Sequence, residues 1–129
     1  MPMLGLFGIF GRSKDLQRLD AALRAQGLHP RLMPEAAKLT IFKLLREDSG
    51  QSSPDVEVYE QAAGLLVYCR LGARAYMEEN GVPALDAVEA RLEKALEEGK
   101  SLDARLVLLL LHGNLVQPSV SERFDLSIG

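Results

Sequence analysis

One cysteine and two histidines are the side chains of this sequence best suited to nucleophilic or acid–base chemistry: Cys69, His29 and His112. A thiol held against an imidazole is activated as a nucleophile, so Cys69 and His112 would mark a pocket if the fold brought them together. Each also has a structural interpretation. Cys69 lies in the apolar letters "LLVYC", where a free cysteine packs as a small hydrophobe. His112 ends a helical pattern, where an imidazolium interacts with the helix dipole. We favour the structural roles.

Carboxylates recur at helical spacing, at Glu57 and Glu60 and again at Glu89 and Glu93. Such pairs can exchange protons with a substrate, but solvated helix faces carry the same pattern. Carboxylate-bridged metal centres in helical bundles use Glu-x-x-His, and neither histidine has a Glu three positions before it. A single cysteine forms no cysteine zinc cluster. The sequence therefore predicts no catalytic residues, no metal and no cofactor.

The segment 1–12 combines an apolar run with basic residues that follow it. Its letters "GLFGIFGRSK" lack the order of a phosphate-binding loop, in which Gly is followed by Lys and a hydroxyl. A secretory signal carries its charges before the run, and a membrane span needs about 20 apolar residues. Two interpretations remain, packing on protein or contact with an anionic membrane surface. Packing is favoured, because three glycines weaken any helix here. The residues concerned are Leu6, Phe7, Phe10, Arg12 and Lys14.

Length and charge set further limits. A chain of 129 residues fits a single helical domain, 1–129, and the absence of a possible disulfide suits the cytoplasm. Residues 1–46 carry a net charge of +5 and residues 47–129 carry −8. Such polarity can attract a second copy. The overall charge of −3 and the 5% aromatic content argue against a nucleic-acid partner.

Leucine and alanine recur at helical spacing along most of the chain, with proline before and glycine after each run. The pattern predicts helices over 13–26, after Pro34, and over 53–71, 73–80, 83–98 and 101–113, with a short turn at 119–124. Ser53 is expected to cap the third of these helices, and Ser119 with Glu122 has the form of a capping box. No alternating, strand-like pattern is present. The predicted fold is all-α, one compact bundle of five to six helices. The polar letters "EDSGQSSPD" predict a mobile loop at 48–54.

The letters "LVLLLL" at 106–111 are apolar around the whole helix. Such a helix is either central or covered on its outer side by a second copy. We therefore expect a non-enzymatic helical interaction or structural module that forms a homodimer and can also bind a protein partner. Two alternatives stay open: a peripheral anionic-lipid binder that uses segment 1–12, and a small-molecule binder or enzyme with a pocket near Cys69 and His112.

Overall fold

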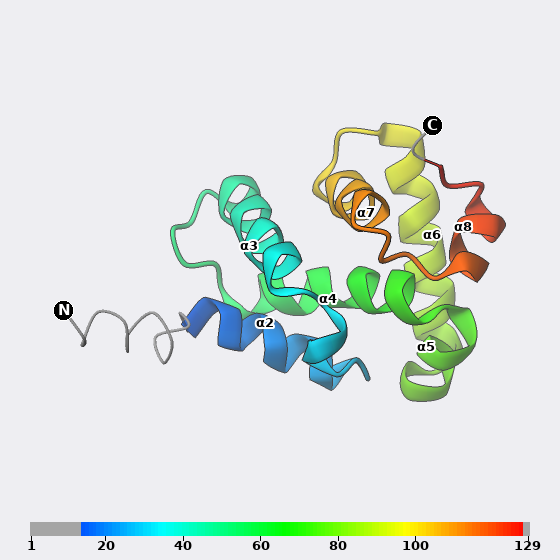
Figure 1. The fold of residues 1–129 in the computed structure, drawn as a ribbon, viewed down its shortest axis with the longest axis horizontal. Coiled ribbons are helices and arrows are strands. Elements are labelled where there is room, and N and C mark those ends of the chain that lie inside the picture. Colours follow the sequence, from blue (N-terminus) through cyan, green and yellow to red (C-terminus); the bar gives the residue numbers. More distant parts are fainter. Residues whose placement is uncertain (1–13, 128–129) are drawn as a thin grey trace.

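The structure is a computed structural model that describes residues 14–127. These residues form seven α-helices and one short 3-10 helix and contain no strand, which confirms the all-α prediction (Figure 1). The count exceeds the expected five to six because Pro118–Phe124, where a short turn was expected, is a helix. The elements are α2 (Lys14–Ala25), η1 (Pro30–Leu32), α3 (Glu35–Ser49), α4 (Val56–Leu71), α5 (Ala73–Asn80), α6 (Val82–Glu98), α7 (Leu102–His112) and α8 (Pro118–Phe124).

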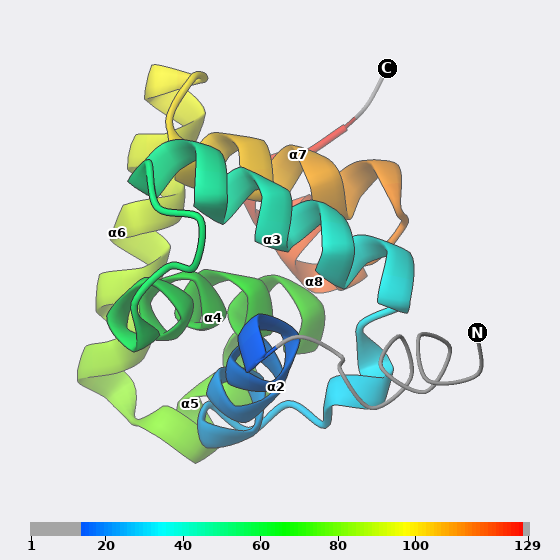
Figure 2. The same ribbon diagram turned by 90° about the vertical axis from the view of Figure 1, so that its left-hand side faces the viewer.

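Helix α4 is the centre of the bundle. It contacts α2, α3, α5, α6 and α7, and Figures 1 and 2 show these helices arranged around it. Every residue from 62 to 69 is buried. Three of these residues, Ala62, Ala63 and Gly64, are small, so neighbouring helices approach the α4 backbone closely. A helix that is buried on every side must lie inside the core.

Helix α7, which the apolar letters made a candidate for the centre, lies at the edge instead. It buries Leu106, Val107 and Leu110, whereas Leu108 on its outer side is 50% exposed. Helix α3 packs beside it (Figure 2). The second interpretation, that another copy covers the outer side of α7, stays a prediction.

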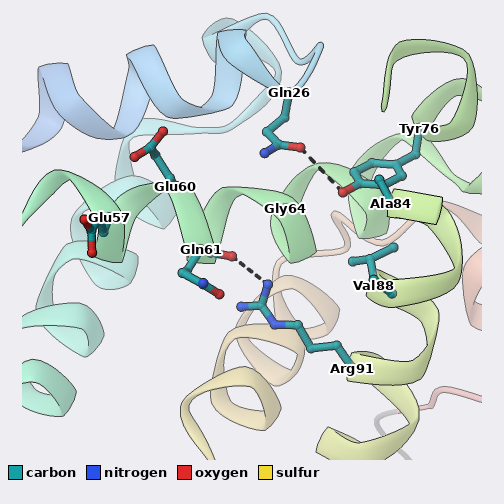
Figure 3. Close-up of a pocket in the computed structure, with 10 residues that line it drawn as sticks. Gln26, Glu57, Glu60, Gln61, Gly64, Tyr76, Ala84, Val88 and Arg91 are labelled. Atoms are coloured by element: carbon teal, nitrogen blue, oxygen red, sulfur yellow. Dashed lines mark hydrogen bonds between the residues drawn. The ribbon is translucent and has the colours of Figure 1, made fainter. Parts of the chain in front are cut away.

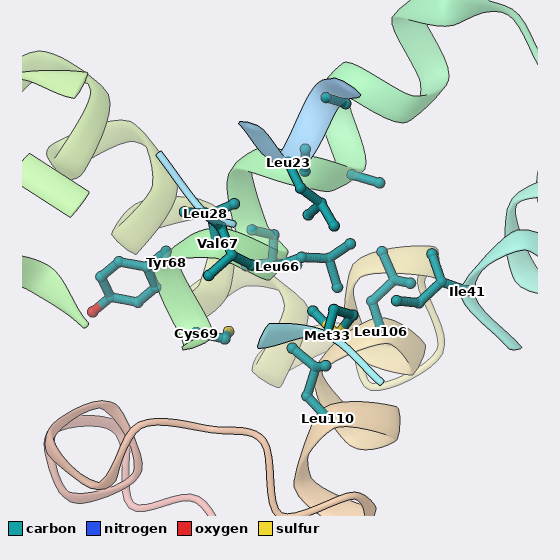
Figure 4. Close-up of a cluster of buried hydrophobic side chains, with 14 of the residues drawn as sticks. Leu23, Leu28, Met33, Ile41, Leu66, Val67, Tyr68, Cys69, Leu106 and Leu110 are labelled. Atoms are coloured by element: carbon teal, nitrogen blue, oxygen red, sulfur yellow. The ribbon is translucent and has the colours of Figure 1, made fainter. Parts of the chain in front are cut away.

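One continuous apolar cluster joins α2, α3, α4 and α7. Figure 4 shows Leu23, Ile41, Leu66 and Leu106 pointing into it from these four helices. Each of the four side chains is fully buried. Burying a leucine or isoleucine stabilises a fold by roughly 1.5–3 kcal/mol, so this cluster holds the helices together.

Several helix ends follow the expected local chemistry and two do not. Ser101 caps α7 by accepting a hydrogen bond from the Ala104 amide at 3.2 Å. Ser53 was expected to cap α4, but Asp55 holds that position. The Ser119–Glu122 capping box was likewise wrong, because Gln117 caps α8.

A carboxylate ties the connection between α3 and α4 to α2. Asp15 is buried and accepts hydrogen bonds from the Ser53 hydroxyl at 2.8 Å and the Tyr59 hydroxyl at 2.9 Å. Arg18 donates to Ser53 at 3.2 Å. Helix α3 continues to Ser49, so the first residues of the expected 48–54 loop are helical. The mobility of residues 50–54 stays a prediction.

A second carboxylate fastens α8 to the bundle. Glu89 of α6 accepts a hydrogen bond from the Tyr68 hydroxyl at 2.7 Å and forms an ion pair with Arg123 at 2.9 Å. Gly72 adds a steric requirement at the corner between α4 and α5. Its φ is +94°, and a Cβ there would lie 3.1 Å from the Ser119 hydroxyl oxygen. Glycine therefore lets α8 approach this corner.

Candidate functional site

An open groove of about 550 Å³ runs between α4 and α6, with the end of α2 and part of α5 beside it (Figure 3). A second hollow of similar size, at the end of α3, is lined by exposed residues throughout. The first groove differs because its floor is built from buried residues, and it is therefore the candidate site. Its lining residues are Gln26, Glu57, Glu60, Gln61, Gly64, Tyr76, Ala84, Ala87, Val88 and Arg91.

The floor of the groove exists because α4 has no side chain at Gly64. This glycine is buried within the helix, where glycine costs about 1 kcal/mol relative to alanine. A Cβ at this position would lie 3.6 Å from the Tyr76 hydroxyl and 3.7 Å from Arg91 Nη1. On α6, Ala84 and Ala87 line the opposite wall. Small residues of both helices thus line the groove, and Tyr76 and Arg91 approach the α4 backbone at Gly64.

Arg91 forms one wall of the groove and is held from two sides. Its Nε and Nη2 donate to the Asp103 carboxylate at 2.7 and 2.9 Å, and its Nη1 donates to the Gln61 carbonyl at 2.6 Å. These bonds join α6 to α7 and α4. The Asp103 carboxylate balances the charge, so this guanidinium is not free to bind an anion. Hydrogen bonds of this kind lie in the guanidinium plane, and the flat faces remain able to stack on an aromatic ring.

Tyr76 closes the groove at the end near α5. Its side chain is buried, and its hydroxyl lies 3.5 Å from Gln26 Oε1. Burial raises the pKa of Tyr76, with the charge of Arg91 acting weakly in the opposite direction. The phenol therefore stays neutral near neutral pH and serves as a hydrogen-bond donor. Its ring meets the Tyr68 ring edge to face at 5.9 Å, which fixes its orientation.

The rim of the groove is acidic. Glu57 and Glu60 are exposed on the first turns of α4. Among residues 14–127, no cation lies within 4.0 Å of either carboxylate. The charge of Arg91 is already balanced, so the groove carries a net negative charge. It favours a ligand with a cationic end and an apolar end.

The expected Cys69–His112 pair has no common site in this groove. Cys69 is fully buried, and desolvation raises the pKa of its thiol to about 12. Such a thiol stays protonated and is a poor nucleophile. His112 is exposed as the last residue of α7. Neither residue lines the groove.

Most of the expected interaction residues cannot be placed. Leu6, Phe7, Phe10 and Arg12 lie outside the described residues, and Lys14 is exposed at the start of α2. Within residues 14–127, no set of three or more His, Cys, Asp and Glu side chains is arranged to hold a metal ion. No helix in the same part of the chain is both long and apolar enough to cross a membrane.

Sequence reasoning singled out Glu57 and Glu60 as a carboxylate pair but missed Gly64, Tyr76 and Arg91. One signal for Gly64 was available, because a glycine inside a strong helical pattern often marks a close approach or a site. Arg91 gave no signal, since its meaning depends on Asp103 and on the backbone of α4. Comparison of the chain with protein-family models, curated proteins and solved structures finds no match.

Proposed function

We propose that this chain is a non-enzymatic helical interaction module that self-associates, with the groove between α4 and α6 as its receiving surface. The observation that carries the proposal is the combination of a small-residue floor at Gly64 with the unpaired carboxylates of Glu57 and Glu60. A chain segment with an apolar side chain and a nearby cation complements both features. Recognition of this kind needs only shape and charge.

The state of the polar groups favours binding over catalysis. Glu57 and Glu60 are exposed and stay solvated, and Arg91 is engaged by Asp103 and by the α4 backbone. Tyr76 is neutral at neutral pH, as any phenol is, and burial raises its pKa further. These groups can orient a partner, but none is an activated nucleophile or a base held against one.

Charge supports a second copy as the partner. The acidic half of the sequence, 47–129, contributes every lining residue of the groove except Gln26. The basic half, 1–46, carries the net charge of +5. Two copies therefore attract each other when the basic part of one meets the groove of the other.

Light scattering of the purified full chain tests self-association. We expect a mass of about twice 14.1 kDa at micromolar concentration and a shift toward monomer in high salt, because salt screens the attraction. The variant Gly64→Leu fills the floor of the groove and should favour the monomer. The control Ala36→Leu adds the same side chain to the exposed face of α3 and should leave the dimer intact. A monomer for the unmodified chain at all accessible concentrations contradicts the proposal.

A further inference from the structure

We propose that the groove is occupied by residues 1–13 of a second copy, with the Phe10 ring against the Arg91 face at the level of Gly64 and Arg12 beside Glu60. This inference rests on the self-association proposed above and names the segment that mediates it. Three features support it: the positions of the phenylalanines, the spacing of the groove residues and the unpaired carboxylates at the rim.

The distribution of phenylalanines along the chain points to residues 1–13. The chain has four phenylalanines. Phe42 is partly buried beneath the Arg46 guanidinium, and Phe124 packs edge to face on Tyr68 at 6.4 Å. The other two, Phe7 and Phe10, precede the described residues. Burial of a phenylalanine ring is favourable, so an apolar site in the groove would favour binding of either ring.

The groove is suited to an aromatic ring. Ala87 on α6 carries only a methyl group, and Arg91 forms one wall beside Gly64, whose Cβ position lies 3.7 Å from Arg91 Nη1. Arginine faces stack favourably on aromatic rings. The buried Tyr76 offers a ring edge and a neutral hydroxyl at the closed end. An aliphatic side chain would fill the same space without the stacking.

The spacing of Phe10 and Arg12 matches the spacing of Gly64 and Glu60 on α4. Gly64 and Glu60 are one helical turn apart on α4, which separates them by about 6 Å along the axis. Phe10 and Arg12 are two residues apart, so in an extended segment they lie on the same face about 7 Å apart. A segment that runs antiparallel to α4 thus places Arg12 at Glu60 when Phe10 lies against Arg91 at the level of Gly64. Glu57, almost one turn further, faces the start of α2 in the second copy, where Lys14 is exposed.

Each copy has one such segment and one such groove, so two copies can exchange their segments reciprocally. Reciprocal exchange closes the assembly as a symmetric dimer. The two Arg12–Glu60 pairs that it contains give a direct test by charge reversal.

The test compares three full-length samples: Arg12→Glu, Glu60→Lys, and an equimolar mixture of the two. In a homodimer of either variant, both exchanged pairs carry like charges. We expect the dimer dissociation constant to rise at least about 10-fold, since each juxtaposition replaces attraction by repulsion. In the mixed dimer both pairs are opposite in charge, and we expect a value within about 3-fold of the unmodified chain. The control Glu97→Lys changes the net charge equally on an exposed part of α6 outside the groove and should leave the dimer unchanged.

The possible results separate this inference from the proposed function. If the unmodified chain is a dimer and none of these variants changes its dissociation constant, the exchange of segments is wrong and self-association still stands. If the unmodified chain is a monomer, both proposals are wrong. Rescue in the double variant Arg12→Glu/Glu60→Lys without rescue in the mixture means that the segment binds its own groove, which overturns the role of a second copy. If Arg12→Glu alters only sedimentation with phosphatidylglycerol vesicles, a lipid surface is the partner and the inference is wrong.

Discussion

The three tyrosines of this chain should stay protonated in alkaline solution until the fold is lost. Tyr59, Tyr68 and Tyr76 are all buried. Desolvation is the largest cause that raises the pKa of each. Hydrogen bonds to the carboxylates of Asp15 and Glu89 raise the pKa of Tyr59 and Tyr68 further, because a carboxylate cannot accept a bond from a tyrosinate.

The sign of the effect on stability follows from proton binding. An unfolded tyrosine releases its proton near pH 10, whereas the folded one retains it. Above about pH 10 the unfolded chain therefore binds fewer protons than the folded chain, and stability falls as pH rises. At about pH 11 the loss is close to 1.4 kcal/mol for a tyrosine that remains protonated, or about 3 kcal/mol for Tyr59 and Tyr68 together. A domain with a total stability of about 5–15 kcal/mol then loses between a fifth and about half of it.

The assay follows two signals in one pH titration: the ultraviolet absorbance of tyrosinate and the circular dichroism of the helices. The chain has no tryptophan to obscure the absorbance. We expect both signals to change in a single transition well above pH 10, with all three tyrosines ionising together. Ionisation of one or more tyrosines near pH 10 with full helical signal would refute this reasoning, because it would place those hydroxyls in water.

Two further outcomes are expected. Gly64→Ala should stabilise the fold by about 1 kcal/mol and raise the melting temperature by about 4 °C, because alanine favours the helix and its Cβ meets Tyr76 and Arg91 at ordinary contact distances; a lower melting temperature would mean that the floor of the groove has no room for a methyl group. The buried thiol of Cys69 should react with Ellman's reagent only after unfolding in guanidinium, and rapid reaction of the native chain would contradict its burial.

Helix boundaries could be predicted from the sequence where they depend on a few neighbouring residues. Pro34 precedes α3, Ser101 caps α7 and Gly72 separates α4 from α5, and each of these effects depends on a few neighbouring residues. The choice of the central helix was not local. Helices α4 and α7 are both strongly apolar, and the small residues of α4 at 62–64 decide that other helices can surround it.

The groove was harder to predict for the same reason. Its floor depends on the absence of a side chain at Gly64, and its wall depends on Arg91 meeting Asp103 across the turn from α6 to α7. Neither the identity of Arg91 nor its position in the helical pattern reveals that contact. The acidic rim was visible as a charge pair, but only the fold shows that Glu57 and Glu60 border a hollow.

The bidentate ion pair between Arg91 and Asp103 has a consequence for any mutational screen of binding. Asp103 does not line the groove, yet it orients the side chain that forms the groove wall. Without the Asp103 carboxylate, the Arg91 guanidinium keeps only its bond to the Gln61 carbonyl and is free to move within the groove that we propose as the binding surface. Such a screen would therefore score Asp103 among the strongest positions, and a footprint drawn from those scores would extend onto α7, beyond the residues that line the groove.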